Sequence, residues 1–232
     1  MHEIQHYEIL VIGSGEAGKW MTWTMAQAGH RTAVERKHIG GSCPNIACLP
    51  SKNVIRSAKA NWFARHAAEY GIQTGPVSTD MRGVFSRKRK MVQGEVQFHL
   101  DRFKATGAEL IKGEARFVAP KTVEVSLPDG GKRMITGDRV FLDLGSRSMI
   151  PDIPGLAAAK PMTHVEALDL QRLPEHLIVL GGTRCARVHQ SERAIAGHRA
   201  RRLGYGGLCR QPPVYACCLR RFPSGPRQSK RR

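Results

Sequence analysis

The chain has 232 residues, which is enough for one large or two small domains with a buried core. It contains no run of 18 apolar residues, so no transmembrane helix is predicted, and its first residues lack the basic start and apolar core of a signal peptide. We therefore expect a cytoplasmic protein with no membrane partner. The formal net charge of +18 raises nucleic acid as a candidate partner.

The positive charge is concentrated near the C-terminal end of the sequence. Residues 183–232 hold 13 Lys and Arg against one acid, whereas residues 1–182 hold 24 against 18. Aromatic side chains for base stacking are sparse in this basic tail, and no nucleic-acid motif accompanies them. We interpret 183–232 as an irregular, solvated segment. A nucleic-acid binding module that uses the tail is the less favoured alternative.

The first predicted element is a buried strand over 7–12, which runs directly into a G-x-G-x-x-G segment at 13–18. A helix is predicted from 17 to about 27, and a second strand ends at Glu35, 20 residues after Gly15. Glycines at this spacing permit a tight turn and close approach of a pyrophosphate. The helix N-terminus supplies N–H donors, and the acid binds a ribose hydroxyl. The sequence therefore predicts a Rossmann-like dinucleotide site.

The segment 40–52 contains two cysteines, Cys43 and Cys48, followed by Lys52. In a regular helix the two Cα atoms would lie about 7.5 Å apart along the axis, and a disulfide tolerates at most about 7 Å. If the cysteines pair, the segment is a distorted turn, which Pro44 and Pro50 favour because neither donates in a helical ladder. We favour a reducible, redox-active disulfide; the alternative is two separate buried thiols.

Helices are predicted next over 51–70 and 81–106, the second capped by Thr79 or Asp80. The four cations at 87–90 are interpreted as a solvated helix face. The period then changes to that of short strands, which are predicted over 109–112, 114–118, 122–127 and 133–136, and a further buried strand is predicted over 139–144. After a proline-spaced connector, we expect a helix over 165–173 and a strand over 175–180 that ends in two glycines.

The segment 40–52 resembles the G-G-T-C-x-N-x-G-C-x-P-S-K signature of the pyridine nucleotide-disulfide oxidoreductases, with Ser42 for Thr and Ala47 for Gly. That family includes dihydrolipoamide dehydrogenase, glutathione reductase and mercuric reductase, and residues 44–47 look most like the mercuric-reductase-like subgroup. The resemblance covers about residues 5–182. It implies an α/β fold with a Rossmann-like FAD-binding domain, arranged as a three-layer sandwich with a small antiparallel β insertion. An incomplete second nucleotide domain and an irregular tail would follow.

The resemblance also implies domain limits and a set of FAD contacts. The FAD-binding domain with its redox disulfide would span 1–156, the start of an NAD(P)-binding domain 157–182, and the basic tail 183–232. No metal site is predicted. The residues implied to contact FAD are Gly13, Ser14, Gly15, Glu16 and Ala17 for the pyrophosphate, Glu35 with Arg36 for the ribose, Ala115 for adenine, Gly41, Ser42 and Lys52 near the flavin, and Gly145 and Ser146 after the last strand of the domain.

In the mechanism that the resemblance implies, NAD(P)H reduces FAD, and FAD reduces the Cys43–Cys48 disulfide. Cys48 would be the thiolate that faces the flavin, and Cys43 the interchange thiol that attacks a small disulfide or Hg(II). Lys52 would favour the thiolate and the reduced flavin through its charge. Leu144 replaces the Thr of the family's T-G-S motif.

The sequence departs from the family pattern after Gly182. Val188 stands where the second nucleotide motif has its glutamate. The rest of the NAD(P)H domain, the dimerisation domain of these homodimeric enzymes and the partner-subunit His–Glu acid–base pair have no counterpart. We therefore expect an incomplete form with weak flavin binding and no appreciable turnover, and the alternative is an inactive FAD-binding remnant.

The abrupt loss of pattern suggests that 183–232 is out-of-frame translation. Sequencing the gene tests this hypothesis, because a one-base shift should restore the G-Y-x-G-x-E pattern downstream of Gly182. The vicinal pair Cys217 and Cys218 lies in this tail, and we interpret it as a coincidence rather than as a C-terminal mercury-binding pair.

Overall fold

The computed structural model describes residues 4–30, 32–35, 38–180 and 217–219. The chain divides into two compact units, residues 1–146 and 147–232, and each is considered by itself. The sequence had placed the first domain boundary after residue 156, ten residues further on. Among the described helices, none is long and apolar enough to cross a membrane.

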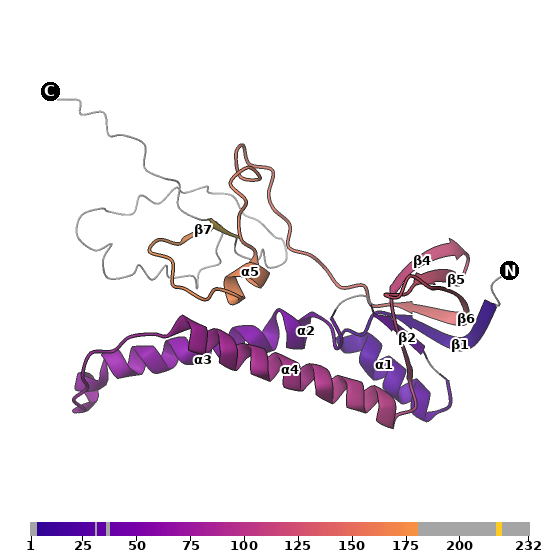
Figure 1. Cartoon of the computed structure of the whole chain (residues 1–232), viewed down its shortest axis with the longest axis horizontal. Helices are drawn as coiled ribbons and strands as arrows, with labels where there is room; N and C mark the ends of the chain where they lie inside the picture. Colours follow the sequence, from indigo (N-terminus) through magenta and orange to yellow (C-terminus); the bar gives the residue numbers. More distant parts are fainter. Residues whose placement is uncertain (1–3, 31, 36–37, 181–216, 220–232) are drawn as a thin grey trace, which may run out of the picture. The chain divides into compact units, whose positions relative to one another are not determined.

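The first unit is built on a six-stranded mixed sheet with the order β3-β2-β1-β6-β5-β4 (Figure 1). The strand β1 pairs in parallel with β2 and β6, and β2 pairs in parallel with β3. The strands β4, β5 and β6 form an antiparallel meander, as expected for the β insertion. The bounds are β1 Ile4–Ile12, β2 Thr32–Glu35, β3 Glu109–Lys112, β4 Glu114–Ala119, β5 Thr122–Ser126 and β6 Lys132–Leu142.

Two separate clusters of buried side chains show that the first unit has three layers. One cluster joins Leu10 and Ile12 of the parallel sheet to Val123, Val125 and Ile135 of the meander. The other lies between the sheet and the helices α1 (Glu16–Gln27) and α4 (Met81–Ala105), and its buried members are Trp23, Ile39 and Phe103. Helices therefore cover one face of the sheet and the meander covers the other, which confirms the predicted three-layer α/β fold.

The strand β6 is continuous over Lys132–Leu142, so the prediction of two strands separated near Gly137 was wrong. Gly137 lies within the strand, paired with Tyr7 of β1. A Cβ atom at this position would lie 2.8 Å from Cβ of Leu10. The glycine is needed where β1 and β6 approach closely rather than where a strand ends. Because β6 is unbroken, this one strand pairs both with β1 of the parallel sheet and with β5 of the meander.

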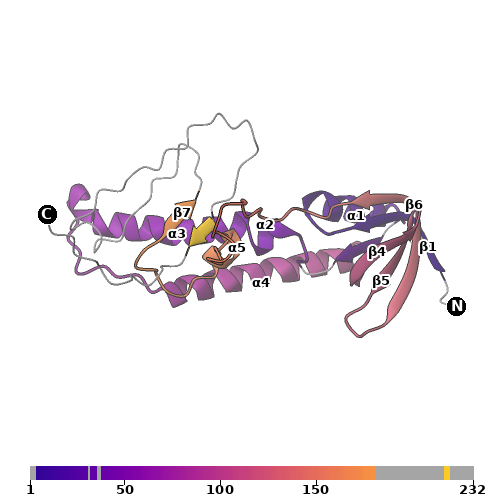
Figure 2. The same cartoon turned by 90° about the horizontal axis from the view of Figure 1, so that it is seen from above.

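The helices α3 (Cys48–Arg65) and α4 form an antiparallel hairpin, and they lie side by side in both views (Figures 1 and 2). The predicted helix 51–70 is shorter at its C-terminal end, where a 3₁₀ turn, Ala67–Tyr70, replaces the last α-helical turn. At the start of α4, the Asp80 carboxylate accepts a hydrogen bond from the Arg82 N–H, so Asp80 is the cap.

The cations at 87–90 do not form a uniformly solvated face, which corrects the sequence interpretation. Arg87 donates hydrogen bonds to the carbonyl oxygen of Asn53 and to Oγ of Ser57, both at 2.6 Å, and so ties α4 to α3. Lys88 is 4% exposed, with its Nζ 4.8 Å from the centroid of the Phe85 ring. One of the four cations thus joins the two helices, and a second is buried.

The second unit contains the helix α5 (His164–Leu168) and the paired strands β7 (Ile178–Leu180) and β8 (Cys217–Leu219). Thr163 and Glu166 form a capping box at the start of α5. The helix ends at Leu168, five residues before the predicted end at 173. Most of the predicted irregular tail lies outside the described residues, and its described part, residues 217–219, is a short strand.

Candidate active site

The glycine loop between β1 and α1 is closed around a carboxylate from the end of β6. Gly13 has a φ of +105°, and a Cβ atom there would lie 2.1 Å from the carbonyl oxygen of Asp143. Cβ atoms at Gly15 and Gly18 would lie 2.6 and 2.8 Å from Oδ2 of Asp143. The Gly18 N–H donates a 2.8 Å hydrogen bond to the same oxygen. The three glycines are therefore required by the close approach of Asp143 and, at Gly18, of the Gly13 carbonyl oxygen.

A second loop fastens the cysteine segment to the glycine loop. The Gly40 N–H donates to Oγ of Ser14 at 3.1 Å, and Ser14 is fully buried. Gly41 has a φ of +79°, and a Cβ atom there would lie 2.5 Å from Cα of Gly15. The side-chain amide of Asn45 donates to the carbonyl oxygens of Ile39 and Gly41. Residues from both predicted motifs thus lie at one place, beyond the carboxyl end of β1.

The helical structure is interrupted between the two cysteines. The short helix α2 (Ser42–Asn45) contains Cys43, and α3 begins at Cys48. Ala47, between them, has the non-helical angles φ −132° and ψ −95°. This is the distorted geometry that a pairing of the two cysteines requires.

The two cysteines are free thiols that interact with each other. Burial of the Cys43 thiol, its hydrogen bond to Cys48 and the charge of that neighbour raise the pKa of Cys43 to about 11. Glu16 raises this pKa further through its charge, and the charge of Lys19 lowers it. Cys48 is exposed, whereas Cys43 is half-buried. Cys43 is therefore the cysteine whose reactivity depends most on its surroundings.

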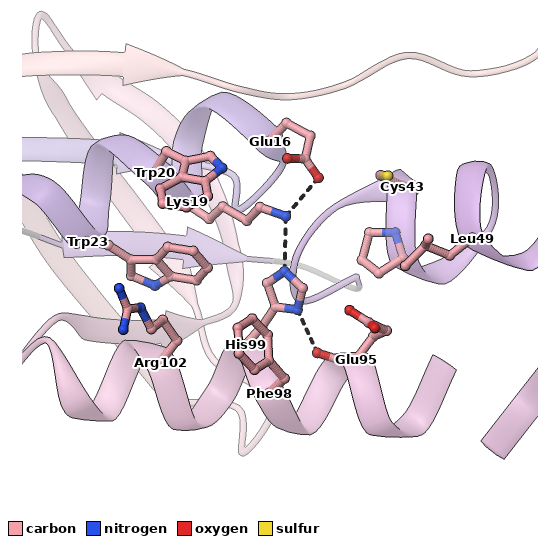
Figure 3. Close-up of a pocket in the computed structure, with 11 residues that line it drawn as sticks. Glu16, Lys19, Trp20, Trp23, Cys43, Leu49, Glu95, Phe98, His99 and Arg102 are labelled. Carbon is pink, nitrogen blue, oxygen red and sulfur yellow. Dashed lines mark hydrogen bonds and ion pairs between the residues drawn. The ribbon is translucent and has the colours of Figure 1, made fainter. Parts of the chain in front are cut away.

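Cys43 opens into a pocket of about 490 Å³ between α1, the cysteine segment and α4 (Figure 3). Its lining combines aromatic side chains with charged and titratable groups. The lining residues are Glu16, Lys19, Trp20, Trp23, Cys43, Pro44, Leu49, Glu95, Phe98, His99 and Arg102. The pocket gives a small molecule access to the sulfur of Cys43.

The sequence did not predict the roles of Lys19 and His99, which are both buried in this pocket. Lys19 Nζ lies 2.7 Å from Oε1 of Glu16 and 3.0 Å from Nε2 of His99. The only local signal for the ion pair between Glu16 and Lys19 was their separation of three residues in the sequence, next to the glycine motif. His99 follows Lys19 by 80 residues, and no spacing rule connects the two.

The other predicted site residues are distributed around this centre. Glu35 ends β2, Ala17 is exposed on the first turn of α1, and Ser42 is exposed at the start of α2. Lys52 is exposed on α3, one turn after Cys48. Ala115 packs against the cluster between sheet and meander, and Arg36 lies outside the described residues. Gly145, with a φ of +70°, and Ser146 follow β6.

Among the described residues, no group of three or more His, Cys, Asp or Glu side chains is placed to hold a metal ion. Cys43 and Cys48 are two ligands at most, and the acids nearest to Cys43 in the pocket are Glu16 and Glu95.

The family model for pyridine nucleotide-disulphide oxidoreductases matches residues 7–190. The mercuric reductase of Staphylococcus aureus is 32% identical over 177 residues, which cover 75% of this chain and 31% of that protein. The dihydrolipoyl dehydrogenase of Chlorobaculum tepidum is 32% identical over 179 residues, covering 76% of this chain and 38% of that protein. The chain belongs to the pyridine nucleotide-disulphide oxidoreductase family.

A solved structure agrees with this assignment. The Cu(II) complex of the HOCl-induced flavoprotein disulfide reductase RclA from Escherichia coli superposes with a TM-score of 0.63 at 26% identity. The match covers 75% of this chain and 36% of that chain. The chain thus spans about a third of the length of these relatives. The family is flavin-dependent and acts on disulfides or, in the mercuric reductases, on mercury.

Proposed function

We propose that this chain binds FAD at the glycine loop and uses Cys43 and Cys48 as a redox-active pair toward a small disulfide or Hg(II). The fit of FAD is supported by the loop itself, where added Cβ atoms at Gly13, Gly15 and Gly18 would meet other atoms at less than 3 Å. Backbone that approaches this closely, at the N-terminus of α1, suits a diphosphate. Bound FAD would supply two-electron redox chemistry to the cysteine pair.

The observation that carries the proposal is the break in the helical structure between the two cysteines, at Ala47, in a segment that packs on the glycine loop. Gly41, two residues before Cys43, packs on Gly15 of the nucleotide loop, so the cysteine pair is fixed next to the proposed flavin site. Cys43 faces the pocket, which supports its assignment as the thiol that meets the substrate. A thiolate attacks a disulfide sulfur directly and is also a preferred ligand of soft metals such as Hg(II).

The proposed function also includes domain limits, two further cofactor contacts, an electron donor and a substrate class. We assign residues 1–156 to the FAD-binding domain, 157–182 to the start of an NAD(P)-binding domain, and 183–232 to a basic tail. Lys52, on the second turn of α3, would contact the flavin, and Glu35, at the end of β2, would contact the ribose. The family alone supports NAD(P)H as the electron donor, and the homodimer is the assembly of family members rather than one proposed for this chain. The family alone also supports a small disulfide or Hg(II) as the substrate.

Two measurements on the purified 232-residue protein test the proposed function. FAD added to the protein should give a shifted flavin spectrum with a saturable end point. Oxidation by excess oxidised lipoamide should then convert Cys43 and Cys48 to an intramolecular disulfide, detected as a cross-linked peptide by mass spectrometry. The C43S and C48S variants serve as matched controls that cannot form it. Absence of the cross-link in the wild type would refute the redox assignment, whatever the flavin result.

We expect Asp143→Asn to change stability and FAD affinity in opposite directions. The neutral amide oxygen accepts the Gly18 N–H less strongly, so the free energy of unfolding should fall by about 1 kcal/mol. The substitution also removes a negative charge from the loop proposed to hold a diphosphate, so the dissociation constant for FAD should fall roughly threefold to tenfold. Denaturant unfolding and flavin titration measure the two effects. Weaker FAD binding by this variant would contradict the proposed position of the diphosphate.

A further inference from the structure

Two titratable side chains beside Cys43 are almost completely buried. Lys19, on α1, is 6% exposed, and His99, on α4, is 4% exposed. Figure 3 shows the Lys19 ammonium between the carboxylate of Glu16 and the ring of His99, on the side of the pocket that holds Cys43. A buried lysine loses hydration, so a cation is retained here only because the fold provides partners for it.

The hydrogen bonds define how the histidine holds the lysine. A lysine ammonium has three N–H donors and no acceptor, so Nε2 of His99 is the acceptor of the 3.0 Å bond. The Nδ1 atom of His99 then carries the hydrogen and donates it to the carbonyl oxygen of Glu95, one turn earlier in α4. His99 is therefore neutral, and its ring is fixed by α4. Its ring also packs on Gly40, where a Cβ atom would lie 3.0 Å from it.

This arrangement directs one positive charge at Cys43. Of the groups that act on the Cys43 thiol, burial, Cys48 and Glu16 favour the neutral form, and Lys19 favours the thiolate. The charged groups that face Lys19 from the elements around it are Glu16 on α1 and Glu95 and Arg102 on α4. The thiols of α2 and α3 complete the surroundings. Glu16 is the one acid bonded to Lys19, and its side chain is 58% exposed, so solvent screens its charge more than that of the lysine.

We infer that Lys19, held in place by Glu16 and His99, is the cation that stabilises the Cys43 thiolate and the thiolate leaving from a substrate disulfide in this pocket. The inference rests on the proposed exchange function of the cysteine pair. It assigns Lys19 an electrostatic role toward the reacting sulfur atoms and makes His99 a positioning residue that acts through Lys19.

In the exchange reaction, the reduced Cys43–Cys48 pair donates two electrons to the substrate disulfide. The Cys43 thiolate attacks one sulfur of a disulfide R–S–S–R′, a bond forms between Cys43 and RS, and R′S⁻ leaves with the electron pair of the broken bond. The thiolate of Cys48 then attacks Cys43, which forms the Cys43–Cys48 disulfide and releases RS⁻. Both released thiolates take protons from solvent. Lys19 lowers the energy of negative charge on sulfur at the start and during departure.

The rate of alkylation of Cys43 by iodoacetamide tests the inference, because the rate follows the thiolate population and needs no flavin. The full chain is reduced with dithiothreitol, desalted and alkylated between pH 7 and pH 10, and the Cys43 peptide is quantified by mass spectrometry. Peptide resolution is needed because the chain has six cysteines. At pH 9 we expect Lys19→Met to slow Cys43 about tenfold, equivalent to a one-unit rise in its pKa.

The matched variants separate charge from structure. Lys19→Arg keeps the cation and should react within about threefold of the wild type. His99→Gln keeps an acceptor for Lys19 and should also stay close to the wild-type rate, whereas His99→Leu should slow Cys43 about threefold. Lys59→Met, an exposed lysine on α3, should leave the rate and the pH profile unchanged. Circular dichroism and the Tm identify any variant that fails to fold.

The inference is overturned if a folded Lys19→Met protein alkylates Cys43 with the wild-type pH profile, or if Lys19→Arg is as slow as Lys19→Met. Should Lys19→Met not fold, Lys19→Gln keeps a hydrogen-bond donor for Glu16 and His99 but has no positive charge. It should also slow Cys43 about tenfold, and a wild-type rate in this variant overturns the inference. Formation of the Cys43–Cys48 cross-link in the wild type is scored separately, so failure of the proposed function is distinguished from failure of this inference.

Discussion

Gly13→Ala is expected to lower the free energy of unfolding by about 3 kcal/mol and to abolish FAD binding. About 1–2 kcal/mol comes from placing an alanine in the left-handed region, since Gly13 has a φ of +105°. A further 1–3 kcal/mol, roughly, comes from overpacking, because the new Cβ atom would lie 2.1 Å from the carbonyl oxygen of Asp143. That oxygen cannot move away freely, since the N–H of Asp143 is bonded to the carbonyl oxygen of Ile12 at 2.8 Å.

Gly29→Ala is the matched control for this experiment. Gly29 also has a positive φ, +93°, but no atom lies within 4 Å of the position its Cβ would occupy. It carries the conformational penalty without the collision, so we expect a loss of about 1 kcal/mol and unchanged flavin affinity. Urea unfolding followed by circular dichroism gives the two stabilities, and flavin titration gives the affinities. Equal losses in the two variants would show that the glycine loop is not held against β6 as described.

The features that the sequence predicted correctly are those fixed by local chain geometry. A strand that runs into Gly13, Gly15 and Gly18 and then into a helix requires these glycines for reasons that act within a few residues, so their spacing is a reliable signal. The same is true of Cys43 and Cys48, since a disulfide between cysteines five residues apart requires a distorted turn, which the two prolines favour. Both motifs were found without knowledge of the fold, and the structure places them against each other through Gly41.

The features that the sequence did not predict arise from packing between distant segments. His99 meets Lys19 across 80 residues, and Asp143 meets Gly18 across 125. No sequence spacing connects the two members of either pair. Lysine and aspartate are usually exposed on the surface, so the sequence gives no reason to expect Lys19 or Asp143 inside the site. The continuity of β6 was missed for a related reason. A glycine such as Gly137 usually indicates the end of a strand. Its place inside β6 is explained only by the close approach of Leu10 from β1.

The other large effect is expected in the pH dependence of Cys43 in the reduced protein. Its pKa is raised to about 11, first by burial, then by the hydrogen bond to Cys48 and the charge of that neighbour. At pH 8 only about one Cys43 in a thousand is then a thiolate, so alkylation by iodoacetamide should accelerate about a hundredfold between pH 8 and pH 10. The wild-type protein, reduced and quantified at the Cys43 peptide, gives this profile directly.

Cys48→Ala tests whether the neighbouring thiol contributes to this shift. The substitution removes both the hydrogen bond and the charge of Cys48, so the pKa of Cys43 should fall and its alkylation at pH 8 should rise several-fold. Burial is unchanged in this variant, and the rate should therefore stay below that of an exposed thiol. If Cys48→Ala leaves the profile of Cys43 unchanged, the two reduced thiols are not in contact, and the geometric basis for their pairing is removed.

The same pKa shift sets the sign of a stability effect. Because the pKa of Cys43 is higher in the folded than in the unfolded chain, the folded state holds the proton more tightly. The resulting stabilisation is complete below the ordinary thiol pKa of about 8.5, and it is lost as the pH rises toward about 11. The free energy of unfolding of the reduced wild type should therefore fall over this range relative to Cys43→Ser, which has no thiol to ionise at this position. A difference that grows with pH would have the wrong sign for a thiol kept neutral by burial and by Cys48, and would instead indicate a Cys43 pKa that is lower in the folded than in the unfolded chain.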